Sequence, residues 1–162
     1  MPYAIVMHIE KTAAARIVTL WDILAERDDI GRVKFSDEQI RFNYPPHWTP
    51  LPISFDSIAV LPRKPVAPIL VRPNVTFEIL KLHKEVFDAL PPNSTTVYHQ
   101  PKGWQPHVTL ARDISPDKLG DALTAVLEPW SAFETTLDQV ALVYFRQDGK
   151  SWHVQELWRA QL

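Results

Sequence analysis

Residues 104–111 read Trp-Gln-Pro-His-Val-Thr-Leu-Ala. Polar and apolar residues alternate after the proline, which predicts a β-strand with His107 and Thr109 on one face. An imidazole titrates near neutral pH, so His107 is suited to take or give a proton. The hydroxyl of Thr109 can donate a hydrogen bond to an anion on the same face. The stretch therefore predicts a strand that carries a site of proton transfer.

The tetrapeptide Pro-His-x-Thr occurs a second time, at residues 46–49. Two histidines that face one phosphate can divide the work of general base and general acid. His47 and Thr49 are therefore predicted to complete the site of His107 and Thr109. The two copies differ in their surroundings, because Pro50 follows the first one directly and a proline removes a strand amide.

The remaining sequence predicts alternating strands and helices. Strands are expected at 3–10, 53–61, 68–71, 107–111, 140–146 and 152–162, with two short strands inside 32–44. The first helix is expected from Ala13, capped by Thr12, to about Arg27. The second is expected after a cap at Asn74 or Thr76 and should end at Pro91-Pro92. The third is expected from Ser115-Pro116 to about Glu128. Asp148-Gly149 is a strong hairpin signal.

Two of the helices show an apolar stripe. The first has apolar residues at helical spacing, namely Ile17, Leu20, Trp21 and Leu24. For the second the expected apolar face is Phe77, Leu80, Val86, Phe87 and Leu90.

Composition limits the classes of function. A chain of 162 residues suits a single domain, 1–162, and the repeated tetrapeptide suggests two related lobes. The net charge of −2 gives no global basic field, so any phosphate site must be local. Without cysteine there is no disulfide, thiolate metal site or cysteine nucleophile. No signal-peptide pattern and no run of 18 apolar residues is present. The lack of cysteine fits a cytoplasmic protein, which is the location we expect, and we expect a monomer.

Several segments together resemble one known family. They are Tyr3–Glu10, Ile53–Pro62, Pro68–Val71, Leu82-His83 and, most specifically, Gly103–Ala111. The chain resembles the 2'-5' RNA ligase-like branch of the 2H phosphoesterase superfamily. The resemblance implies an α+β, bilobal fold, with two antiparallel sheets flanking a central groove and helices outside. It also implies opening or hydrolysis of 2',3'-cyclic phosphates or 2'-5' phosphodiesters in RNA ends or small nucleotides, with paired histidines and no metal.

The resemblance leaves the first motif open between two alignments. The family carries this motif in a strand soon after the first helix and then has a further helix, for which the interval 31–53 is too short. In one alignment the motif is His47-Trp48-Thr49. In the other it is the strand Val33-Lys34-Phe35-Ser36, in which Lys34 replaces the histidine and can bind phosphate but is a poor acid.

Three further residues are candidates for substrate binding. Trp104 precedes the second motif and is able to stack on a base, although a loop anchor packed on the core is the other interpretation. Arg112 follows the motif and can neutralise phosphate, although strict alternation turns it to the face opposite Thr109. His8 lies on the first strand, on the face opposite Met7 and Ile9, and is a candidate to line the groove.

The sequence predicts neither a metal site nor a cofactor. No His-Glu-x-x-His or comparable cluster is present, and there is no glycine-rich phosphate loop. The preferred hypothesis is a metal-independent phosphoesterase whose substrate is an RNA terminus or small nucleotide with a cyclic or 2'-linked phosphate, with no membrane partner. The alternative is a catalytically degenerate domain of the same fold that binds nucleotide or RNA without turnover.

Overall fold

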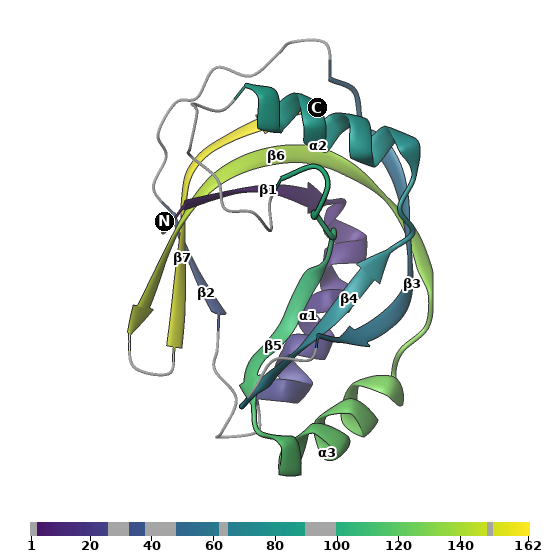
Figure 1. The fold of residues 1–162 in the computed structure, drawn as a ribbon, viewed down its shortest axis with the longest axis vertical. Helices are drawn as coiled ribbons and strands as arrows, with labels where there is room; N and C mark the ends of the chain where they lie inside the picture. The colour runs from purple at the N-terminus through teal and green to yellow at the C-terminus, as the bar shows by residue number, and fades with distance from the viewer. Residues whose placement is uncertain (1–2, 26–32, 38–47, 62–64, 90–99, 149–150) are drawn as a thin grey trace.

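A computed structural model describes residues 3–25, 33–37, 48–61, 65–89, 100–148 and 151–162. Its elements, in chain order, are β1 (Tyr3–Ile9), α1 (Lys11–Ala25), β2 (Val33–Asp37), β3 (Leu51–Val60), β4 (Ala67–Pro73), α2 (Phe77–Asp88), β5 (Val108–Ile114), α3 (Pro116–Leu127), β6 (Phe133–Asp148) and β7 (Ser151–Gln161) (Figure 1). The fold is α+β, as the sequence predicts.

The strands of the described residues form one mostly antiparallel sheet of seven strands. Their order is β2-β7-β6-β3-β4-β5, β1 also pairs with β6, and the pair β2–β7 is parallel. The long strand β6 arches over the molecule (Figure 1). Its segment Phe133–Leu137 pairs with β3, whereas Gln139–Asp148 pairs with β7. The two sheets that were expected are therefore two halves of one continuous sheet, which β6 joins. This arrangement is consistent with a 2H-like fold.

We call β1, β2, β7 and the later part of β6 the first half of the sheet, and β3, β4, β5 and the start of β6 the second half. The two halves share β6 without a break in its hydrogen bonding. On this ground we propose that the chain is one domain built of two lobes.

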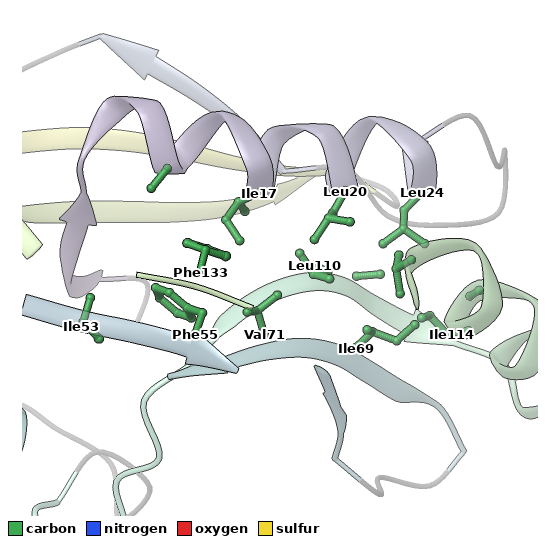
Figure 2. Close-up of a cluster of buried hydrophobic side chains, with 14 of the residues drawn as sticks. Ile17, Leu20, Leu24, Ile53, Phe55, Ile69, Val71, Leu110, Ile114 and Phe133 are labelled. Atoms are coloured by element: carbon green, nitrogen blue, oxygen red, sulfur yellow. The ribbon is translucent and has the colours of Figure 1, made fainter. Parts of the chain in front are cut away.

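Helix α1 covers the second half of the sheet. Ala13, Ile17, Leu20 and Leu24 recur at helical spacing and are all buried. Figure 2 shows α1 lying over β3, β4 and β5, with Leu20 above Leu110. The predicted cap at Thr12 is wrong, because the helix already begins at Lys11 and the amide of Ala14 donates to the carbonyl of Glu10 at 2.9 Å.

Helix α2 packs on the first half through Leu82 and Val86, while its Ile79 joins the core of the second half. The predicted cap at Thr76 is confirmed, since its hydroxyl accepts from the amide of Ile79 at 3.3 Å. The predicted apolar face is wrong in part, because Phe77 and Leu80 are 76% and 40% exposed. The buried stripe consists of Ile79, Leu82 and Val86, at spacings of three and four residues. Leu90 lies outside the described residues.

The two helices are thus exchanged between the halves. α1 connects β1 to β2 of the first half but packs on the second. α2 connects β4 to β5 of the second half, yet Leu82 and Val86 pack against Val140 and Trp158 of the first. Trp48 joins this cluster, and its Nε1 donates to Oε2 of Glu85 on α2 at 2.7 Å.

The remaining elements agree with expectation except in length. α3 begins at Ser115-Pro116 as predicted, and its Val126 is buried with α1. β6 is longer than the predicted 140–146, because Phe133, Thr135 and Leu137 alternate inward along its first part. Asp148 pairs with Ser151, which confirms the hairpin. Of the two short strands predicted within 32–44, one is β2, and the other lies outside the described residues. No helix of the described residues is both long and apolar enough to cross a membrane.

Candidate active site

His107 stands exposed immediately before β5. Its Nδ1 lies 2.7 Å from the backbone oxygen of Gln105. A carbonyl oxygen only accepts hydrogen bonds, so Nδ1 must carry a proton. In the neutral ring the lone pair then belongs to Nε2, which is the atom that can act as a base. The local backbone thus selects one tautomer of His107 for proton transfer.

The strand that follows His107 is held from two sides. Nε1 of Trp21, on α1, donates to the backbone oxygen of Thr109 at 3.0 Å. Leu110, Ala111 and Ile114 are buried under α1 and α3 (Figure 2). A motif anchored to a packed strand changes its geometry little when a ligand binds, which favours catalysis by preorganised groups.

The pairing of β4 with β5 shows which face the motif occupies. Val108 pairs with Val71, which is fully buried, and Thr109 pairs with Leu70. Paired residues share a face and successive residues alternate, so Thr109 lies on the face turned away from the core of α1. His107, two residues before Thr109, immediately precedes β5 and has no partner in the pairing with β4. The register thus fixes the face of Thr109, and the common face of His107 and Thr109 stays a prediction.

A bulge changes the placement of Arg112. Thr109 pairs with Leu70 but Ala111 already pairs with Ile69, so β5 has an extra residue at this point. Ala111 therefore joins Ile69 on the core side. Arg112, which comes next and is exposed, then falls on the face of Thr109, opposite to what strict alternation predicts. The register brings Arg112 to the same side as the motif.

Trp104 links the motif to α2. Its indole stacks on the imidazole of His83, with ring centroids 3.9 Å apart and planes at 10°. The amides of Gly103 and Trp104 both donate to the oxygen of Gln100, at 2.9 and 3.0 Å, which makes a tight turn before the strand. Trp104 is half-buried and packs on the main core, so it anchors the loop, and His83 covers one face of its ring.

His8 lies on β1 and meets charged residues of β7. Its Nε2 is 3.5 Å from Oε2 of Glu156, and Arg159 binds both carboxylate oxygens of Glu156 at 2.8 and 2.7 Å. The 3.5 Å contact is an ion-pair distance without hydrogen-bond alignment, and Nε2 has no hydrogen bond within the described part of the chain. Burial, together with the charge of Arg159, lowers the pKa of His8 below 6.5, against the opposing pull of Glu156 and Asp138.

This lowered pKa of His8 makes stability depend on pH. The unfolded chain takes up the proton at a higher pH than the folded protein, so this contribution to stability is complete above pH 6.5 and is lost as pH falls through the lower folded pKa. We expect His8→Gln to flatten the fall in melting temperature between about pH 7 and pH 5 relative to wild type. Thermal unfolding at a series of pH values measures this. Equal slopes for the two proteins would contradict it.

Residues 5–149 match the family model of the 2'-5' RNA ligase superfamily. The chain belongs to this superfamily. The match covers most of the sequence and confirms the predicted relationship to the 2H phosphoesterases. A search of curated proteins found no match.

Both candidates for the first superfamily motif fall inside the matched range, so the match does not choose between them. His47 lies outside the described residues. Thr49 is exposed in the segment Trp48–Pro50 that leads into β3, while Trp48 is buried. Lys34 and Ser36 lie on the edge strand β2, in register with His153 and Gln155 of β7. The structure thus places the second motif of this superfamily member at the start of a strand, and Thr49 of the first candidate outside one.

One charged residue on the strand beside the motif is not among the residues predicted from the sequence. Arg72 lies on β4 directly after Val71 and is half-buried. The only sign of Arg72 in the sequence is that a cation directly follows the apolar run Ile69-Leu70-Val71. A hollow on the surface lies away from the motif. A shallow hollow between α1 and the α3–β6 connection is lined by Arg16, Thr19, Leu20, Pro129, Trp130 and Ser131. Within the described ranges, no cluster of three His, Cys, Asp or Glu residues could hold a metal.

Proposed function

We propose that this member of the 2'-5' RNA ligase superfamily is a metal-independent phosphoesterase. Its substrates would be 2',3'-cyclic phosphates or 2'-5' phosphodiester linkages in RNA ends or small nucleotides. The observation that carries the proposal is His107, with Nδ1 held by the oxygen of Gln105, immediately before the strand that carries Thr109. An imidazole of fixed tautomer beside a hydroxyl donor suits proton transfer at a phosphate.

The proposed hydrolysis needs two proton carriers. A neutral histidine takes a proton from water, whose oxygen attacks phosphorus, and the bond from phosphorus to a ribose oxygen breaks. A protonated partner gives its proton to that ribose oxygen, so the product is a phosphomonoester and a free hydroxyl. His107 can fill either role at Nε2, with His47 as its proposed partner. Thr109 and Thr49 would hold non-bridging oxygens as charge develops.

Turnover should survive a chelator, because the mechanism uses imidazoles and not a metal-bound water. We expect purified protein in EDTA to open 2',3'-cyclic nucleotides, or to cleave a 2'-5'-linked dinucleotide, at the rate seen without EDTA. Chromatography of the nucleotide products provides the measurement. A 3'-5'-linked dinucleotide is the matched control for linkage. A rate that falls on chelation and returns with a divalent ion would contradict the proposal.

The alternative is a domain that binds nucleotide or RNA without turnover. It is favoured by one observation, that Thr49 of the first candidate motif lies outside any strand. In that case, nucleotides would shift the NMR resonances of the His107 ring, but no substrate of either linkage would be consumed.

A further inference from the structure

Arg72 is a cation in an apolar setting. It is half-buried, and the three residues before it, Ile69, Leu70 and Val71, are each 2% exposed or less. Within the described part of the chain, its guanidinium has neither a salt bridge nor a side-chain hydrogen bond. Withdrawing a charge from water is costly unless an opposite charge compensates it. The surroundings of Arg72 therefore favour an anion that the described residues do not supply.

The register of β4 and β5 places Arg72 next to the motif. Leu70 pairs with Thr109, and Val71 pairs with Val108. Continuing this antiparallel ladder by one residue beyond its last pair would set Arg72 opposite His107, which immediately precedes β5, at a Cβ separation of about 5 Å for directly opposed residues. Val71 is fully buried on the core side, so Arg72 lies on the opposite side of the sheet, the side that Thr109 takes. On its other flank Arg72 pairs with Ser57 of β3, which is exposed.

We propose that Arg72 is a substrate-binding residue that holds the phosphate at His107. The inference rests on the proposed phosphoester chemistry for its role in turnover, whereas the anion site itself rests on placement and charge. A guanidinium presents a rigid fork of donors that matches two phosphate oxygens, and it keeps its charge at any working pH. Arg72 and Thr109 then flank the phosphate, leaving the scissile bond to His107.

The test measures binding of inorganic phosphate by NMR of the His107 ring, in buffer whose counter-ion is chloride. We expect phosphate to shift this resonance in wild type, and Arg72→Gln to weaken the binding about 10- to 100-fold through loss of a charge-assisted contact. Arg72→Lys keeps the charge but not the fork and should fall between the two. Arg146→Gln, which removes an exposed strand arginine of the first half, is the matched control and should bind like wild type.

The inference is overturned if wild type binds no phosphate at His107, if Arg72→Gln binds as tightly as wild type, or if Arg146→Gln weakens binding equally. If Arg72→Gln does not fold, the affinity of Arg72→Lys for inorganic phosphate decides. An affinity equal to that of wild type would contradict binding of phosphate by the guanidinium fork of Arg72. Turnover separates the two proposals. Phosphate binding that depends on Arg72 without any turnover supports the anion site and defeats the phosphoesterase. Turnover that is equal in wild type and Arg72→Gln supports the phosphoesterase and contradicts the role of Arg72 in holding the phosphate.

Discussion

Replacing His107 with alanine should lower kcat/KM on a 2',3'-cyclic nucleotide by about 100- to 10,000-fold, the range that a positioned acid or base contributes. The fold should persist, because His107 is exposed and its Nδ1 bonds to the nearby oxygen of Gln105 rather than to the core. Steady-state kinetics with circular dichroism of the same samples test both statements. His153→Ala, a half-buried strand histidine of β7, is the control and should keep activity. Undiminished turnover by His107→Ala would remove this residue from the mechanism.

The second large effect depends on which segment carries the first motif. If His47 is the partner, His47→Ala should cost about as much as His107→Ala. The double variant should then lose little more, because residues that act as one unit are not additive. If β2 carries the motif instead, His47→Ala should be nearly silent. Lys34→Ala should then raise KM through the loss of a local positive charge.

Kinetics of the three single variants and the double variant on one substrate distinguish these cases. A silent His47→Ala would end the two-histidine mechanism. Thr49→Val and Ser36→Ala are matched probes of the hydroxyl in each alignment, and only the one in the true motif should reduce turnover. We favour His47, because a second Pro-His-x-Thr is rarer by chance than the loss of a loop or helix in a fold that tolerates such changes.

Periodicity predicted the fold best where one side of an element is plainly apolar. The stripe Ile17, Leu20 and Leu24 is buried as expected. Periodicity failed for the first part of β6, where Thr135 occupies an inward position and interrupts the apolar alternation. It also failed for Phe77, which is apolar but lies on the solvent side of α2. Apolar character alone does not say which stripe of a helix meets the sheet, because that depends on the partner.

The candidate site was predictable only in its local part. A strand with His107 and Thr109 on one face follows from alternation within a few residues. The sides taken by Arg72 and Arg112 depend on the pairing of β4 with β5 and on a bulge, and neither is encoded locally. The contact of His8 with Glu156 likewise joins distant parts of the chain. Register between strands is therefore the information that the sequence did not provide.

The exchange of α1 and α2 between the halves bears on how a ligand reaches the site. Enzymes that close two lobes around a ligand do so at hinges where few packed contacts cross. Here the apolar cluster under α1 also includes Ile79 of α2 and Met7 of β1, the cluster under α2 includes Leu51 of β3, and β6 is bonded to both halves. Opening along the line between the halves would separate apolar clusters on both sides at once. Ligands should therefore enter a site that is already assembled, with side-chain adjustment in place of lobe closure.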